Sequence, residues 1–200
     1  MGALTGAHRT FKGHSSGSRR HESTEAMTKD TNTLPYRPCV GLMVLNRAGL
    51  VWVGRRADTP GEPEGPGAWW QMPQGGIDEG EVPRKAALRE LREETSIQSV
   101  EFIAEMADWL HYELPASLQG KTWGGRYRGQ KQKWFALRFH GHDREVDIRP
   151  GAGQKAEFDA WKWAPITDLI GLIVPFKREV YRAVVAEFEP HALPIDTRAP

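Results

Sequence analysis

Three glutamates at helical spacing carry the clearest chemical signal in the sequence. Glu90, Glu93 and Glu94 stand at positions i, i+3 and i+4, so on a helix their carboxylates project from one side. Crowded carboxylates repel each other unless a cation compensates them. Because the donors are all oxygens, with no His or Cys among them, the pattern favours Mg²⁺ or Mn²⁺ over zinc. A solvated acidic helix face is the alternative interpretation of the trio taken alone.

The residues around the trio predict a turn followed by a helix. Gly75 to Glu81 form a segment rich in glycine and acid, and its glycines let backbone groups approach the carboxylates. Pro83 favours a helix start, where its missing N–H is no loss. Arg89 precedes Glu93 by four residues, the spacing at which a guanidinium can hold a carboxylate. The residues expected to face the core from this helix are Ala87, Leu88 and Leu91.

The whole segment resembles the Nudix box. Gly75 is followed after five residues by Glu81, and after seven more by the run Arg89-Glu90-Leu91-Arg92-Glu93-Glu94-Thr95-Ser96-Ile97. The family hydrolyses nucleoside diphosphates linked to another moiety, with divalent ions held by the box helix. Ser96 departs from the pattern, because a glycine usually follows the glutamate pair. Since this position closes the helix and favours a left-handed residue, the helix end is expected to differ slightly, with no metal ligand affected.

Segments outside the box resemble the bacterial RNA pyrophosphohydrolases, which remove pyrophosphate from the 5′-triphosphate end of RNA. The similar segments lie at residues 36–38, 70–77, 129–135, 157–161 and 176–181, and the resemblance covers roughly residues 36–188. The same subfamily includes asymmetric dinucleoside tetraphosphate hydrolases, which give ATP and AMP, and that activity is the alternative. A Nudix domain that binds nucleotides or RNA without cleaving them is a further alternative, although all the box acids are present.

The resemblance also implies roles for individual residues. The expected metal ligands are a backbone carbonyl at or beside Gly75 and the carboxylates of Glu90, Glu93, Glu94 and Glu157. These glutamates and Arg89 are the expected catalytic residues, and either Glu90 or Glu157 would orient or deprotonate the attacking water. The expected substrate contacts are Arg37, Arg56, Gln130, Lys131, Lys133, Val174, Phe176 and Lys177. Alternatives are helix packing for Phe176, a solvated position for Lys177 and a surface glutamate for Glu157.

A basic segment from Lys121 to Lys133 predicts a loop that contacts phosphates. It contains five Lys or Arg residues and no acid, with Trp123 and Tyr127 between them. Cations and aromatic rings in one loop suit phosphate contact and base stacking. A flexible solvated loop is the alternative.

Composition excludes several classes of protein. The formal net charge is +1, so there is no general attraction to polyanions, and any preference for nucleic acid must come from local patches. No DNA partner is expected. A single cysteine, Cys39, excludes an intramolecular disulfide framework and fits a reducing compartment. No apolar run approaches membrane-spanning length. We therefore expect a cytoplasmic protein with no membrane partner.

One domain is expected over residues 34–190, with a disordered extension at 1–33 and a tail at 191–200. An organellar transit peptide is the alternative for the extension. Strands are expected at 39–45, 50–55, 100–106, 109–112, 134–139 and 160–164, a Pro/Gly-rich loop at 57–68 and a second helix at 175–188. This arrangement favours an α+β fold with a central mixed sheet, in agreement with the αβα sandwich that the Nudix resemblance implies.

The expected function follows from the box and the segments around it. We expect hydrolysis of a phosphoanhydride at the 5′-triphosphate end of RNA, which leaves a 5′-monophosphate and begins mRNA decay. The expected cofactor is Mg²⁺, with Mn²⁺ or Zn²⁺ as substitutes. The expected partner is 5′-triphosphorylated RNA or, in the alternative, a dinucleoside polyphosphate.

Overall fold

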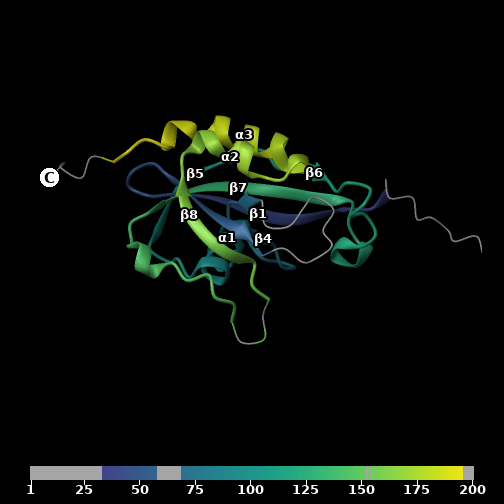
Figure 1. Cartoon of the computed structure of the whole chain (residues 1–200). Coiled ribbons are helices and arrows are strands. Elements are labelled where there is room, and N and C mark those ends of the chain that lie inside the picture. The colour runs from purple at the N-terminus through teal and green to yellow at the C-terminus, as the bar shows by residue number, and fades with distance from the viewer. Residues whose placement is uncertain (1–32, 58–68, 152, 154, 196–200) are drawn as a thin grey trace, which may run out of the picture.

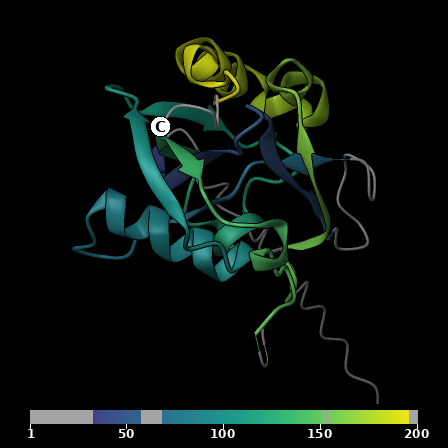
Figure 2. The ribbon, with the colours of Figure 1, turned by 90° about the vertical axis from the view of Figure 1, so that its left-hand side faces the viewer.

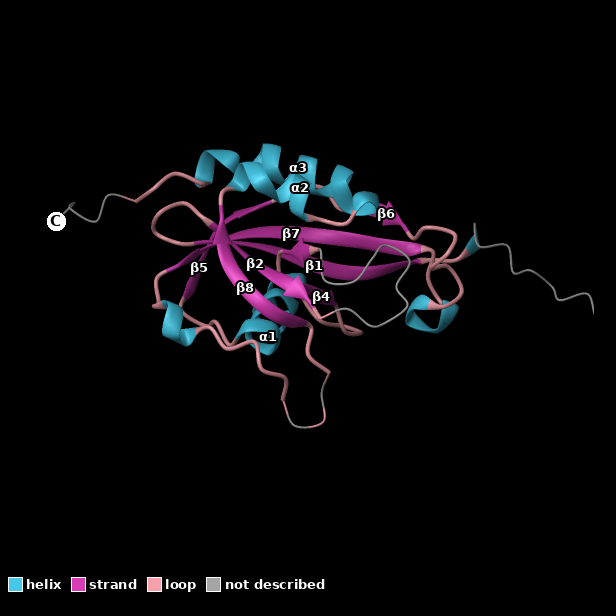
Figure 3. Ribbon diagram, in the orientation of Figure 1, coloured by secondary structure: helices cyan, strands magenta, loops and turns pink. Residues whose placement is uncertain are grey.

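The computed structural model describes residues 33–57, 69–151, 153 and 155–195, and these form a sheet between layers of helix (Figure 1, Figure 3). The expected extension at 1–33 and loop at 57–68 fall almost entirely outside the described residues. The strands are β1 (Tyr36–Leu45), β2 (Val51–Arg56), β3 (Trp70–Gln71), β4 (Gln74–Gly76), β5 (Val100–Glu105), β6 (Leu110–Glu113), β7 (Gly129–Phe139) and β8 (Phe158–Ala164). The α-helices are α1 (Pro83–Thr95), α2 (Leu169–Leu172) and α3 (Arg178–Phe188), and short 3₁₀ helices include η2 (Thr122–Gly125) and η5 (Pro175–Lys177).

The sheet is mixed. Its main order is β3-β2-β1-β7-β5, with β4 added to β1, β6 to β7 and β8 to β2. β1 and β7 run parallel from the pair Tyr36–Gly129 to the pair Leu45–Arg138, whereas β1 and β2 form the predicted antiparallel hairpin. Figure 2 shows α1 on one face of the sheet and α2 and α3 on the other. The prediction of an α+β fold with a central mixed sheet is therefore confirmed.

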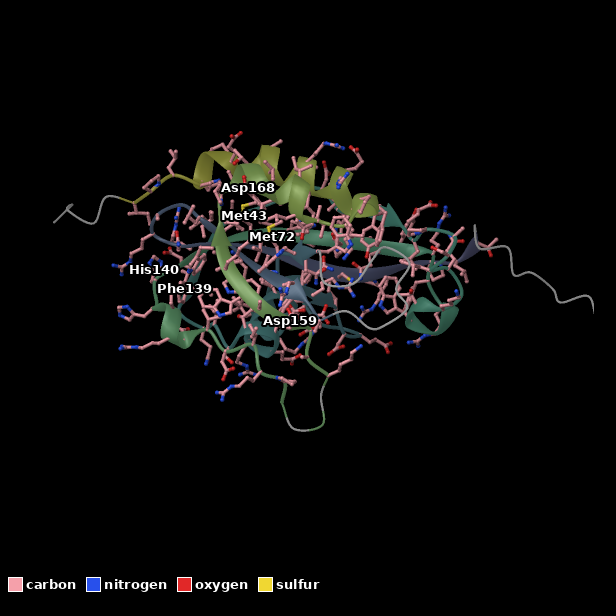
Figure 4. All side chains as sticks on the ribbon, in the orientation of Figure 1. Met43, Met72, Phe139, His140, Asp159 and Asp168 are labelled. Carbon is pink, nitrogen blue, oxygen red and sulfur yellow. The ribbon has the colours of Figure 1, made fainter. Side chains whose placement is uncertain are left out.

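Alternating side chains of β1 build a separate core on each face of the sheet. Met43 and Leu45 point to the face covered by α2 and α3, where Val184 and Phe188 of α3 pack. Figure 4 shows Met43 and Met72 between these helices and the sheet. On the other face, Val40, Leu42 and Val44 meet the apolar side of α1. Because both faces of the sheet are covered, the sequence of β1 is a continuous apolar run and does not alternate between apolar and polar residues.

The apolar side of α1 differs in one residue from the expected set. Ala87 and Leu91 are fully buried as expected, and Ala86 joins them. Leu88 is 44% exposed, so the prediction that it faces the core was wrong. The buried side of the helix is formed by Ala86, Ala87, Leu91 and Thr95, so position 88 lies at its solvent-facing edge.

The second half of the expected basic loop is a strand. β7 begins at Gly129, five residues before the predicted start at Trp134. Residues from Gly129 to Lys133 pair on one side with β1 and, from Gly129 to Gln132, on the other with β6. Polar side chains masked this strand in the sequence, but pairing on both sides satisfies its backbone groups and fixes its extended form.

The helix that carries the three glutamates ends at a left-handed residue. Ser96 has φ 62° and ψ 0°, and its backbone N–H donates to Arg92 O at 2.9 Å. Its hydroxyl donates to Asp147 O at 3.2 Å. The usual glycine conformation is thus kept by a serine, at the steric cost that left-handed geometry imposes on any side chain.

The residues expected as a C-terminal tail contact the domain as far as the structure describes them. Arg138 Nη2 donates to His191 O at 2.7 Å, and the Ile195 N–H donates to Arg47 O at 2.9 Å. These bonds hold residues 191–195 against β7 and the β1–β2 turn. Among the described residues, no helix combines the length and apolar character that crossing a membrane requires.

Candidate active site

A pocket of about 370 Å³ opens between the N-terminal part of β1, strand β4, helix α1 and the η5 turn. Two sets of charged side chains line it. We call Glu90, Glu94 and Glu157 the acidic wall, and Arg37, Arg56 and Lys177 the cationic wall. The structure thus brings together most of the residues that the sequence selected, although they come from positions as far apart as 37 and 177.

The acidic wall is built from α1 and the segment before β8. Glu90 and Glu94 lie one turn apart on the helix, and Glu157 reaches the same pocket from the segment directly before β8. Gly75 of β4 permits the close approach of Glu90, because a methyl group at its α-carbon would lie 1.9 Å from Glu90 Cδ. Glu93 does not line the pocket, and its side chain is 47% exposed.

Arg89 holds the acidic wall in place. Its Nε and Nη2 donate to the two carboxylate oxygens of Glu81 at 3.0 and 2.8 Å, and Nη1 donates to Glu90 Oε1 at 2.8 Å. A further bond from Nη2 to Gly76 O, at 2.8 Å, joins the helix to β4. The predicted contact with Glu93 exists only as an ion pair at 3.5 Å. Hydrogen bonds from Arg89 hold the pKa of Glu81 down to about 2.

Glu94 is the carboxyl group of the acidic wall whose ionisation the protein disfavours most. Burial raises its pKa well above the ordinary value of 4.5, and repulsion from Glu157 and Glu90 adds to this effect. The Gln74 N–H donates to Glu94 Oε2 at 3.2 Å and acts in the opposite direction. Beside it, Gln71 Nε2 donates to Glu157 Oε1 at 3.3 Å, while the buried Gln71 Oε1 has no hydrogen-bond partner among the residues that the structure describes.

These residues fit a hard cation by their chemistry. The acidic wall offers carboxylates that repel one another, and the Gln71 Oε1 atom adds a further oxygen donor. Within the part of the chain that the structure describes, however, no three Asp, Glu, His or Cys side chains are already arranged to hold a metal ion. Glu90 is paired with Arg89, and Glu93 lies outside the pocket.

The cationic wall comes from three separate elements. Arg37 lies in β1, Arg56 ends β2, and Lys177 ends η5. Lys177 is 4% exposed, so it is not the solvated residue of the alternative interpretation. Burial and the neighbouring Arg56 lower the pKa of Lys177 to about 8, although Glu157 and Glu94 act against that shift.

Aromatic and apolar side chains lie beside the cations. The Phe176 ring is 5.5 Å from that of Tyr112, and Val174 is buried next to them in the pocket. Trp123 also lines the pocket, and the Arg37 guanidinium lies 5.5 Å from its ring centroid. Trp123 has φ 52°, an uncommon conformation for a large side chain. The basic segment therefore supplies an aromatic residue to the pocket.

Lys131 and Lys133, two of the expected substrate contacts, point away from the pocket. Lys131 Nζ lies 5.4 Å from the Trp109 ring centroid. Lys133 Nζ donates to the carbonyls of Met106 and Ala107 and pairs with Glu105 at 3.2 Å. Because successive residues of a strand point to opposite faces, Gln130 enters the pocket while its neighbour Lys131 does not.

Several pocket residues were not selected from the sequence as site residues. They are Trp69, Gln71, Gln74, Gly76, Tyr112, Leu114, Leu118 and Thr122, whereas Trp123 was noted only as part of the basic segment. The one available signal was the position of Trp69 to Gly76 directly before the box, since a strand paired with β1 would carry its side chains to the box helix. The others reach the pocket only through pairing between β6 and β7 and through the turn that follows.

Three comparisons with known proteins bear on the chain as a whole. A family model described as the NUDIX domain matches residues 35–184. The RNA pyrophosphohydrolase of Brucella ovis is 57% identical over 171 residues, which cover 84% of this chain and 96% of the relative.

Solved structures resemble this protein in fold. The E. coli dihydroneopterin triphosphate pyrophosphohydrolase has a TM-score of 0.57 at 21% identity, covering 76% of this chain and 99% of that protein. The C. elegans Ap4A hydrolase, in a binary complex, has a TM-score of 0.53 at 20% identity, covering 76% and 98%. At these identities the likeness concerns the fold alone.

Proposed function

The chain belongs to the Nudix family, and from that premise we propose that its pocket removes pyrophosphate from the 5′-triphosphate end of RNA. Identity of 57% to an RNA pyrophosphohydrolase along nearly its whole length supports this activity. The observation that carries the proposal is that the acidic wall and the cationic wall line one pocket, with Phe176 and Trp123 beside them. A triphosphate needs cations, a base needs an aromatic or apolar surface, and hydrolysis of the anhydride needs a metal-binding acid cluster.

The acidic wall would hold the divalent ion. Glu90, Glu94 and Glu157, joined by Glu93 and by the backbone carbonyl of Gly75, are the proposed ligands, and Mg²⁺ is the proposed ion because all these donors are oxygens. A bound ion supplies a water of lowered pKa and neutralises charge on the leaving phosphate. Arg89 is a positioning residue, because it bonds to Glu90 and to the Gly76 carbonyl.

The chain's own residues would then direct the hydrolysis. Arg37, Arg56 and Lys177 bind the phosphate oxygens, and Val174 and Phe176 hold a nucleobase. Water attacks a phosphorus of the anhydride chain, the bond between the α- and β-phosphates breaks, and pyrophosphate leaves. Glu90 accepts the proton of the water, with Glu157 as the second candidate. The product is RNA with a 5′-monophosphate, and we place the reaction in the cytoplasm.

The test is a kinetic comparison in Mg²⁺ between a short 5′-triphosphorylated RNA and diadenosine tetraphosphate, with all products identified. We expect kcat/KM for the RNA to be at least about tenfold higher, with pyrophosphate released and a 5′-monophosphate left. A preference for the dinucleotide, with ATP and AMP as products, would instead assign a dinucleoside polyphosphate hydrolase. Binding of either compound without metal-dependent turnover would contradict both activities.

A further inference from the structure

A chain of hydrogen bonds runs from the core to the pocket. The Trp134 indole N–H donates to Gln132 Oε1 at 3.0 Å. Gln132 Nε2 in turn donates to Gln130 Oε1 at 2.8 Å and to Gln74 Oε1 at 3.3 Å. We call these four residues the amide relay. Gln132 is 1% exposed and Gln130 5%, so water has little access to the links between them.

The direction of the amide relay is fixed at its core end. An indole N–H can only donate, so Gln132 must turn its carbonyl toward Trp134 and its NH₂ group toward the pocket. Gln130 and Gln74 must then turn their carbonyl oxygens toward Gln132. Their Nε2 groups are therefore left on the far side of each amide, away from Gln132.

The Trp134 ring is held firmly enough to impose this direction. Its side chain is fully buried, and the Tyr181 ring lies 5.8 Å away with its plane at 79°. Gly41 lies against the opposite side, since a methyl group at its α-carbon would be 2.4 Å from the indole. An indole confined on both sides cannot turn its N–H elsewhere.

The pocket end of the amide relay lies among the charged groups of the site. Gln130 pairs with Arg37 across β1 and with Tyr112 across β6. The backbone N–H of Gln74 donates to Glu94. Gln130 and Gln74 both line the pocket, and among the described contacts neither Nε2 group donates a hydrogen bond. Two neutral N–H donors therefore remain available in the pocket, one of them on the residue paired with Arg37.

We propose that Gln130 and Gln74 donate these N–H groups to phosphate oxygens of the substrate, and that Gln132 is a positioning residue which keeps both amides in the donating orientation. Phosphate oxygens only accept hydrogen bonds, so an amide turned the other way would present a carbonyl and repel them. Gln132 does not line the pocket and acts only through its neighbours. The inference rests on the proposed function, because it concerns the phosphates of that substrate.

The test inverts the amide relay with Gln132→Glu. A carboxylate at this position still accepts from Trp134, but it also accepts from Gln130 and Gln74, so both amides turn their carbonyls toward the pocket. Because two donors become two acceptors, KM for 5′-triphosphorylated RNA is expected to rise about tenfold or more, with kcat within about threefold of wild type. Ala186→Glu, on the exposed side of α3, adds the same charge elsewhere and should leave both constants unchanged.

A double-mutant cycle separates orientation from general damage. Gln130→Met removes one of the amides that Gln132→Glu inverts, so the effect of Gln132→Glu on KM should shrink by about half on a logarithmic scale in that background. Full additivity in a folded double variant, or an unchanged KM in folded Gln132→Glu, would overturn the proposal. If Gln132→Glu does not fold, Gln132→Met replaces it. That variant frees both amides to rotate, and an unchanged KM would again overturn the proposal.

The wild-type measurement keeps the two hypotheses distinct. If the wild-type protein releases no pyrophosphate from 5′-triphosphorylated RNA, the proposed function is contradicted. Active wild type with unaffected variants would contradict the amide relay alone.

Discussion

The two walls of the pocket are assembled differently. The acidic wall has a structural cation of its own, because Arg89 bonds to Glu90, Glu81 and the β4 backbone. The cationic wall is instead assembled from three separate elements, because its members come from β1, β2 and η5. Nevertheless each wall contains one charge that the protein disfavours. Burial raises the pKa of Glu94 and lowers that of Lys177.

This comparison indicates that the site opposes stability on both walls. A buried carboxylate and a buried ammonium are each harder to charge in the folded protein than in the unfolded chain. Their charges are useful only when a cation or a phosphate arrives. Neutral replacements on either wall should therefore lower activity and raise the stability of the metal-free, substrate-free protein.

Glu94→Gln should have the largest effect. Loss of a metal ligand is expected to lower kcat by about a hundredfold to a few thousandfold. When a chelator has removed the metal, the wild-type free energy of unfolding should fall as pH rises above 4.5. The Glu94 carboxyl then keeps its proton in the folded state and loses it in the unfolded state. Glu94→Gln should remove this fall, and denaturant unfolding across that pH range measures it.

Glu93→Gln is the matched control for that variant. If both residues bind the ion, as the resemblance implies, the losses of activity should be similar. The stability change should be small, because the Glu93 side chain is already 47% exposed. Near-normal turnover of Glu94→Gln in saturating Mg²⁺ would remove the metal from the acidic wall.

Lys177→Met tests the cationic wall and should act mainly on binding. Loss of a charged donor to phosphate is expected to raise KM by about ten- to a hundredfold. The wild-type free energy of unfolding should rise between pH 8 and 10.5, because there the unfolded chain binds more protons than the folded protein. The variant should lack this rise. If the variant is less stable than wild type at pH 7, the claim that a buried charge lowers stability on both walls is contradicted.

Ser96→Gly should have the smallest effect, because it alters the end of α1 without touching either wall. Relief of the left-handed serine is worth about 1–2 kcal/mol, and loss of the hydroxyl bond to Asp147 O offsets about 1 kcal/mol. We expect a gain in stability of up to about 1 kcal/mol by denaturant unfolding and unchanged kinetics. A large loss of activity would mean that the helix end positions Glu93 or Glu94.

The acidic wall was largely predictable from the sequence, because its chemistry is local. Glu90 and Glu94 are four residues apart, and helical spacing alone places them together. The strands from β1 to β8 that carry apolar runs were predictable for the same reason. The conformation of Ser96 was not predictable in this way: a slightly different helix end was expected, but the serine keeps the left-handed conformation that glycine usually adopts.

The rest depends on pairing between distant segments. Lys131 and Gln130 are adjacent, and only the register of β7 decides which one enters the pocket. The outward position of Leu88 depends on which side of α1 is buried. The burial of Lys177 likewise requires β6 and the aromatic residues beside it, and periodicity along one helix could not supply that information.

The parallel pairing of β1 with β7 also determines when the site can form. It joins Arg37 to Gln130, so more than ninety residues of chain must be made before these two side chains can meet, and Lys177 comes later still. Contacts of such long range form slowly, whereas the turns of α1 form from neighbouring residues. During synthesis the acidic helix can therefore form before β1 and β7 pair. We expect hydrolytic competence to be among the last properties that the growing polypeptide acquires.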